Sequence, residues 1–126
     1  MMNKSRISGF IVLFFFLLIS ASAAFSQSRW YVNGTTGDDS NSGQAWEQAF
    51  GTVTRALYSA GSGDEIWVAK GTYSPGTTTA SAFALVSGVK MYGGFAGTET
   101  GLAQRDISKL RTENETILDG NSTSYH

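Results

Sequence analysis

The sequence predicts a single all-β domain built from short strands. The chain has 126 residues, with 15 glycines, one proline and only 15% charged residues. Many glycines and few charges are typical of short strands joined by turns, because the solvent faces of a helical bundle require more Lys, Glu and Arg. Several β-branched and aromatic segments separated by glycine support the same fold class. A chain of this length forms one domain but hardly two.

The N-terminus has the features of a secretory signal peptide at residues 1–26. Lys4 and Arg6 precede the apolar run ISGFIVLFFFLLIS, which leads into the small-residue stretch ASAAFS. A membrane anchor is the alternative, but the run is shorter than the roughly 20 apolar residues that span a bilayer. Cleavage is predicted after Ala23 or after Ser26, and the sequence leaves both open. We therefore expect an exported protein with no membrane span in the mature chain.

The mature chain is mildly acidic and contains no cysteine. Removal of residues 1–26 leaves seven basic and ten acidic residues, a net charge of −3. Nucleic acid is not an expected partner, because no basic cluster is present to neutralise phosphates. The absence of cysteine excludes a disulfide framework, a thiol nucleophile and a cysteine metal site. Stability must therefore come from the burial of apolar surface.

The first half of the mature chain predicts a strand followed by a helix. The strand is RWYVN at 29–33. Apolar residues then recur with the spacing of one helical face, at positions 46, 49, 50, 53, 56, 57 and 60. Because Gly51 interrupts this pattern, the helix is expected from about Thr52, whose hydroxyl serves as N-cap, to Ala60, where GSGD ends it. The residues expected to pack beneath the helix are Trp46, Ala49 and Phe50.

The second half predicts β segments separated by glycine-rich turns. They are expected at 65–69 (EIWVA), 83–86 (FALV), 89–95 (VKMYGGF) and 116–120 (TILDG). In the first segment, Ile66 and Val68 face one side and Trp67 faces the other. Ile66 precedes Val89 by 23 residues, and Val89 precedes Ile117 by 28. These steps are near the repeat length of a solenoid, in which each coil buries its face by stacking on the next.

Four blocks of sequence, in this order, carry a family resemblance. They are YVNGTTGDDSNSGQAWEQAFGTVTRAL, GDEIWVAKGTY, GVKMYGGFAGTET with QRD shortly after, and TILDG, and they cover residues 31–120. The succession resembles the N-terminal region of secreted bacterial right-handed parallel β-helix proteins of the pectin-lyase-like superfamily. The resemblance implies that the opening strand and helix cap a solenoid, and that the segments after them form its first two to three coils.

The same resemblance implies that residues 27–126 are the N-terminal part of a β-helix domain. Members of the superfamily continue for hundreds of residues, whereas this chain stops at GNSTSYH with no apparent C-terminal cap. Two to three coils are close to the minimum for a stable solenoid. We therefore expect a fragment truncated at its C-terminus, which aggregates or stays largely unfolded when it is made alone.

Two functions are compatible with the sequence. The favoured one is a non-catalytic adhesion or polysaccharide-binding scaffold, secreted or attached to a bacterial cell surface, because no convergent acids, bases or metal ligands are present. Its partner would be an extracellular polysaccharide or a cell-surface ligand. The alternative is the N-terminal part of a pectate-lyase-like polysaccharide lyase or a glycoside hydrolase whose catalytic coils lie beyond residue 126.

No catalytic or cofactor-binding residue is predicted, and calcium is the only ion with candidate ligands. In the run GDDSNSGQAW, an EF-hand that starts at Asp39 fails, because Gly43 and Phe50 occupy its fifth and twelfth positions. A looser calcium site at Asp38 and Asp39 is the alternative to a turn in which these side chains bond to their own backbone, and the turn is favoured. The resemblance adds Asp119, at a strand end where lyases of this fold hold calcium.

The remaining polar and aromatic residues receive structural interpretations. Asp64 is predicted to lie in a turn, Arg105 to donate hydrogen bonds, and the Gly93–Gly94 pair to allow a bend or a close approach. His126 is terminal, so a Ser-His-Asp triad is not expected. Aromatic side chains on the strands offer sugar-stacking surfaces, but such residues more often pack in a core or at its rim. They are Trp30, Tyr31, Trp67, Tyr73 and Tyr92.

Overall fold

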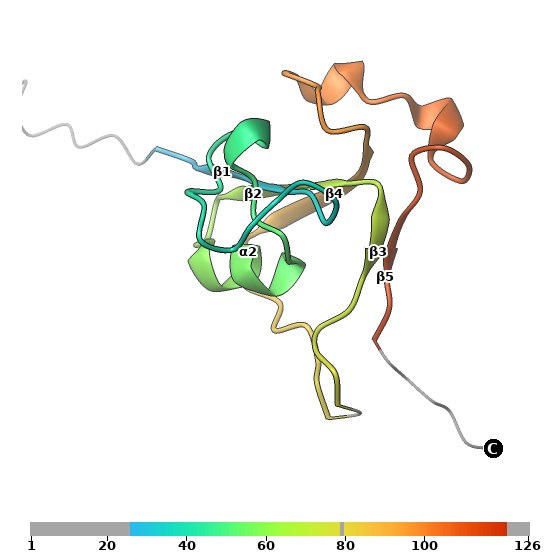
Figure 1. The fold of residues 1–126 in the computed structure, drawn as a ribbon. Coiled ribbons are helices and arrows are strands. Elements are labelled where there is room, and N and C mark those ends of the chain that lie inside the picture. The colour runs from blue at the N-terminus through green and yellow to red at the C-terminus, as the bar shows by residue number, and fades with distance from the viewer. Residues whose placement is uncertain (1–25, 79, 121–126) are drawn as a thin grey trace, which may run out of the picture.

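The computed structural model describes residues 26–78 and 80–120, so the predicted signal peptide, apart from its last residue, lies outside them. The described chain is mostly β-strand with few helices, as predicted (Figure 1). None of its helices is long and apolar enough to cross a membrane. In chain order the elements are β1 (Arg29–Val32), the 3-10 helix η1 (Trp46–Gln48), α2 (Val53–Ser59), β2 (Glu65–Ala69), β3 (Gly71–Tyr73), β4 (Lys90–Phe95), the 3-10 helices η2 (Leu102–Gln104) and η3 (Ile107–Lys109), and β5 (Thr116–Leu118).

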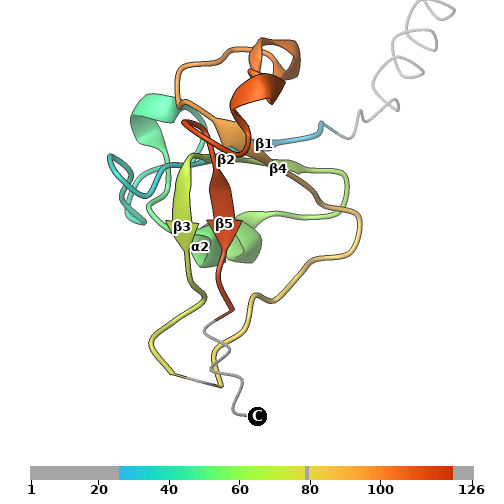
Figure 2. The ribbon, with the colours of Figure 1, turned by 90° about the vertical axis from the view of Figure 1, so that its right-hand side faces the viewer.

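All the strands run parallel, in two sheets. The first sheet has the order β1-β2-β4, and the second pairs β3 with β5. Parallel pairing requires a crossover after each strand, so the paired segments are far apart in sequence. Lys70 alone separates β2 from β3, and the chain passes there from the first sheet into the second. Figure 2 shows β3 and β5 side by side, next to the three-stranded sheet.

The pairing differs from the predicted repeat in two respects. Ile66 of β2 lies opposite Met91, a step of 25 residues rather than the predicted 23 to Val89. The predicted step from Val89 to Ile117 is wrong, because Ile117 belongs to β5 and lies opposite Thr72 of β3. The segment between β4 and β5 is therefore not a regular coil of the predicted repeat, and it contains η2 and η3.

One predicted strand is wrong, and one observed strand was not predicted. The segment 83–86 is not a strand but part of a loop, and Leu85 within it is 77% exposed. An apolar run of four residues predicts a strand only if a partner strand pairs with it. In contrast, β3 was not predicted as a separate strand. This strand begins with a glycine, and its three residues are too few to show an alternation of buried and exposed side chains.

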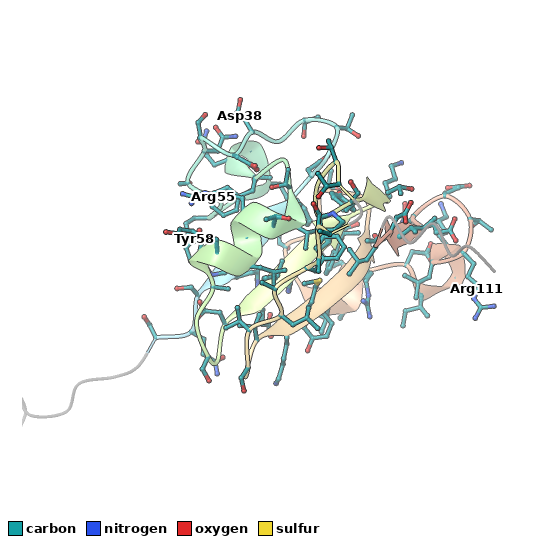
Figure 3. All side chains as sticks on the ribbon, turned by 90° about the horizontal axis from the view of Figure 1, so that it is seen from below. Asp38, Arg55, Tyr58 and Arg111 are labelled. Atoms are coloured by element: carbon teal, nitrogen blue, oxygen red, sulfur yellow. The ribbon has the colours of Figure 1, made fainter. Side chains whose placement is uncertain are left out.

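The main hydrophobic core lies between the three-stranded sheet and α2. Thr52 caps the helix as predicted, since its Oγ1 accepts a hydrogen bond of 3.1 Å from the Arg55 N–H. Val53, Ala56 and Leu57 of α2 are buried against β1 and β2. On the exposed side of the helix, Arg55 and Tyr58 point away from the sheets, with the guanidinium 5.6 Å from the ring (Figure 3).

An aromatic cluster covers the opposite face of the three-stranded sheet. Trp67 is fully buried there, stacked on Phe95 at 4.6 Å between ring centroids and edge-on to Tyr31 at 5.9 Å. Trp46 joins this cluster, with its ring centroid 4.8 Å from that of Tyr31. The prediction that Trp46 packs beneath the helix is therefore wrong, whereas Ala49 and Phe50 are buried, with Phe50 in the helix-side core as expected.

A β-bulge at Gly93 and Gly94 lets β4 complete this cluster. Trp67 lies opposite Tyr92 but Ala69 lies opposite Phe95, so β4 contains one extra residue. Gly94 has a φ of +83°, which glycine adopts without strain, and a Cβ at this position would overlap Leu110. The bulge confirms the predicted bend at the glycine pair, and it shifts Phe95 into position to stack on Trp67.

The free edge of β1 is closed by the loop that precedes α2. The Tyr31 N–H donates to the Gly43 carbonyl at 2.8 Å, and the Tyr31 carbonyl accepts from the Phe50 N–H at 2.8 Å. The Asn33 N–H also donates to the Phe50 carbonyl, at 2.9 Å. The loop thus satisfies the backbone groups that an edge strand would leave unpaired, which prevents a further strand from adding to β1.

Candidate functional site

The run GDDSNSGQAW forms turns, and its two carboxylates have different roles. Asp38, on the surface of the loop (Figure 3), accepts hydrogen bonds from the Ser40 hydroxyl at 2.6 Å and the Ser40 N–H at 2.8 Å. These two bonds lower the pKa of the Asp38 carboxyl. The predicted turn, in which an Asp side chain bonds to its own backbone, is confirmed for this residue.

Asp39 makes longer-range contacts that the sequence did not predict. One of its oxygens accepts from the Gly51 and Thr52 N–H groups at 2.9 Å each, and the other accepts from the Thr52 hydroxyl at 2.7 Å. The loop is thereby fastened to the start of α2, where a carboxylate also complements the partial positive charge of the helix end. In the sequence, only the presence of an acidic residue upstream of the Thr52 N-cap could have indicated this contact.

Calcium binding, the less favoured alternative of the sequence analysis, is not tested by the structure. Among residues 26–78 and 80–120, no group of three or more His, Cys, Asp or Glu side chains is placed to hold a metal ion. The Asp38 and Asp39 oxygens already accept hydrogen bonds from N–H and O–H groups. Asp119 follows β5, as predicted for the end of a strand, and its N–H donates to the Tyr73 carbonyl at 2.8 Å.

Asp64 lies in the predicted turn but also holds β1 in place. Its carboxylate accepts from the Gly61 N–H at 2.9 Å, the Trp30 indole N–H at 3.0 Å and the Ser28 N–H at 2.9 Å. The bond from Gly61, followed by that from Trp30, lowers the pKa of this carboxyl. Ser28 and Trp30 are 36 and 34 residues away in sequence, so only the tertiary structure shows that Asp64 joins the end of α2 to the first strand.

Glu99 is a buried carboxylate for which the sequence offered no interpretation. It is 7% exposed and accepts hydrogen bonds from the backbone N–H groups of Ala96, Gly97 and Thr98 at 2.7–3.2 Å. Burial by itself raises the pKa of this carboxyl, but the backbone N–H donors outweigh burial and lower the pKa overall. The Glu99 carbonyl also accepts from the Trp46 indole N–H at 2.8 Å, which ties η1 to the segment after β4.

A cleft of about 310 Å³ lies between η1 and residues 97–100. Tyr31 and Trp46 supply its aromatic surface, and Glu47, Thr98 and Glu99 supply polar groups. No Lys, Arg or His is among the described residues that line it. The cleft therefore combines aromatic rings with acidic and hydroxyl side chains, which is a composition suited to a polar organic ligand without negative charge.

A second, apolar groove of about 520 Å³ opens between the two sheets. It lies beside the last strand of each sheet, β4 and β5, and beside the loop that contains Leu85. Its apolar side chains come from α2, β2, β4, β5 and that loop. They include Leu57, Val68, Leu85, Val86, Met91 and Leu118.

The structural interpretation of Arg105 is confirmed. Its Nη1 donates to the Gly93 carbonyl at 2.9 Å, and its guanidinium lies 5.7 Å from the Phe95 ring. Arg105 thus supports the bulged part of β4 from the segment after η2. Tyr73 is also structural, since its buried hydroxyl donates to the Ala69 carbonyl at 2.8 Å and accepts from the Gly34 N–H at 3.1 Å.

The predicted sugar-stacking aromatics differ in their surroundings. Trp67 is fully buried, and Trp30 stacks on Phe50 with ring centroids 5.8 Å apart. Tyr92 is half-buried near Arg105. Of the five, only Tyr31 lines the polar cleft, where it is joined by Trp46, which was not among the predicted candidates.

The described residues define a mostly β protein with parallel strands, in which loop hydrogen bonds cover the edge of β1 and which contains a polar cleft and an apolar groove. The family model described as "Protein of unknown function (DUF1565)" matches residues 35–125. The chain belongs to this family. No curated protein and no solved structure matches it.

Proposed function

We propose that this chain forms the capped N-terminal end of a right-handed parallel β-helix, of the pectin-lyase-like kind, in an exported protein that acts as a non-catalytic adhesion or polysaccharide-binding scaffold. The observation that carries this proposal is the difference between the two ends of the sheets. The edge at β1 is closed by loop hydrogen bonds, whereas the edges at β4 and β5 border an exposed apolar groove.

The open end has the properties expected of a surface on which another coil stacks. Within the described residues, β4 and β5 are each paired on one side only, as is β3, but of these three strands only β4 and β5 supply residues to the groove. Leu85, in the loop before β4, and Leu118, in β5, line the groove and remain 77% and 43% exposed. Removal of apolar surface from water is favourable by about 25 cal/mol per Å². Unpaired strand edges can form backbone hydrogen bonds with a further strand. A further parallel coil would bury both features at once.

Four charged side chains of the described chain have structural roles, which supports a scaffold rather than an enzyme. A general acid or base must be able to reach a substrate proton. Asp39, Asp64 and Glu99 instead accept two or more backbone or side-chain hydrogen bonds each, and Arg105 donates to a backbone carbonyl. These side chains bond to other groups of the protein, as expected of residues that hold loops to a rigid β framework.

Export is supported by the predicted signal peptide, in which Lys4 and Arg6 precede an apolar run and a small-residue stretch. The test uses the full chain, expressed with its own signal in a bacterial host. We expect mature protein outside the cytoplasm, retained by at least one immobilised polysaccharide, with no release of unsaturated or reducing sugar ends. Ultraviolet absorbance from unsaturated products, or reducing ends released by hydrolysis, would show an enzyme and overturn the proposal. Retention of uncleaved protein in the cytoplasm would overturn export.

A further inference from the structure

The walls of the polar cleft between η1 and residues 97–100 are fixed by hydrogen bonds. The Trp46 indole N–H donates to the Glu99 carbonyl at 2.8 Å, and the Glu99 carboxylate is held by three backbone N–H groups. The Trp46 ring also packs against Tyr31, with an interplanar angle of 67°. A cleft with walls fixed in this way loses little conformational entropy when a ligand binds.

Three polar side chains at the cleft remain available to a ligand. Within residues 26–78 and 80–120, the Tyr31 hydroxyl, the Glu47 carboxylate and the Thr98 hydroxyl have no hydrogen-bond or ion-pair partner, although all three residues line the cleft. This contrasts with Asp38, Asp39, Asp64 and Glu99, whose carboxylates are all bonded within the fold. The Glu47 side chain is exposed to solvent.

We propose that this cleft binds a single sugar ring that carries no acid group, as a unit of a neutral or amino-containing polysaccharide. A sugar ring presents an apolar face to aromatic side chains and hydroxyl donors to a carboxylate. The volume of about 310 Å³ is at the lower end of the 300–1,000 Å³ range of ligand pockets, which suits one ring rather than a longer segment. A uronic acid would be repelled, because Glu47 and Glu99 are acidic and the lining has no basic residue.

This inference rests on the proposed polysaccharide-binding scaffold and adds the class of sugar that is bound. It predicts a preference opposite to the one that a pectate-binding surface would show. Arg or Lys side chains favour the binding of an acidic polysaccharide, since they pair with its carboxylates, whereas acidic side chains repel them. The seven basic residues of the mature chain are absent from this cleft.

The test measures retention of the full mature chain in gels that contain laminarin, a neutral glucan, chitosan, an amino polysaccharide, or polygalacturonate. We expect retention by laminarin, by chitosan or by both, and none by polygalacturonate. Glu47→Gln should weaken this binding about tenfold, as expected for the loss of a charged hydrogen bond, and Tyr31→Phe should weaken it while keeping the ring. Glu47→Lys should abolish it. The matched control is Glu115→Lys, which changes the same charge at an exposed residue that does not line the cleft and should bind like the wild type.

The outcomes separate this inference from the proposed function. If the wild type is retained and both Glu47 variants bind equally well, the protein binds polysaccharide elsewhere and the cleft is not the site. Retention by polygalacturonate that depends on intact Glu47 would overturn the class of sugar. If the wild type is retained by none of the three polymers, this inference fails together with the polysaccharide-binding form of the proposed function. Circular dichroism of each variant verifies that the fold is intact.

Discussion

Replacement of Leu85 by lysine should specifically reduce self-association of the mature chain. Leu85 is 77% exposed at the rim of the apolar groove, beside the open strands β4 and β5. Full burial of a leucine side chain is worth about 1.5–3 kcal/mol, so association that covers this groove gains up to about 2 kcal/mol from Leu85. Loss of about 2 kcal/mol corresponds to a roughly 30-fold weaker association.

Ile107 provides the matched control, because it is 69% exposed but lies in η3 and does not line the groove. Ile107→Lys adds the same charge and removes a similar apolar side chain. Sedimentation velocity over a range of concentrations measures both variants. We expect Leu85→Lys to shift the association midpoint by about one to two orders of magnitude, and Ile107→Lys to shift it by less than about threefold. Equal shifts for the two variants would refute the hypothesis that association of the chain buries the apolar groove.

Four further predictions follow from the contacts of the acidic residues. Asp64→Ala removes the acceptor of three hydrogen bonds and should lower the free energy of unfolding by about 2–3 kcal/mol in urea titrations, against less than about 0.5 kcal/mol for exposed Glu115→Ala. Thr52→Ala should cost about 1 kcal/mol as an N-cap, and less once Asp39→Ala has already removed the bond to its hydroxyl; additive losses would contradict the shared network. Folding lowers the pKa values of the Asp64 and Glu99 carboxyls. The stability that these two groups contribute is therefore present above their unfolded pKa values of about 4, and it is lost as the pH falls through their folded pKa values. Glu99→Gln should flatten this part of the profile of unfolding free energy against pH. Calcium should leave the melting temperature unchanged, and a rise that Asp39→Ala removes would favour the alternative of a calcium site at this loop.

Elements stabilised by neighbouring residues were predicted well. The helix at Val53–Ser59 follows from its apolar spacing and from Thr52, whose capping bond spans three residues. The central strand at Glu65–Ala69 follows from its β-branched and aromatic alternation. The capping bond of the helix is local, so its pattern alone was sufficient, whereas the strand pattern was correct because β1 and β4 pair with β2.

Contacts between distant residues were not predicted. Asp64 was assigned to a turn, but its bonds to Ser28 and Trp30 span more than 30 residues. The Glu99 cleft depends on the hydrogen bond from Trp46, which is 53 residues away. Neither spacing leaves a periodic signal. The bonds of Asp64 form when β1 pairs with β2, and the bond from Trp46 forms when η1 meets the segment after β4. The candidate cleft was therefore invisible to the sequence, apart from Tyr31 as one of five aromatic candidates.

The sequence by itself determined the fold class, the capping helix and the alternation of the central strands, because side-chain periodicity and backbone preference act over a few residues. The tertiary structure decided which strands pair and which face each aromatic residue covers. Backbone hydrogen bonds between strands are nearly independent of side-chain identity, so β5 could not be assigned to β3 rather than β4 from its sequence. For the same reason, only the assembled sheets reveal that the edge at β1 is closed by its loop while those at β4 and β5 border an apolar groove.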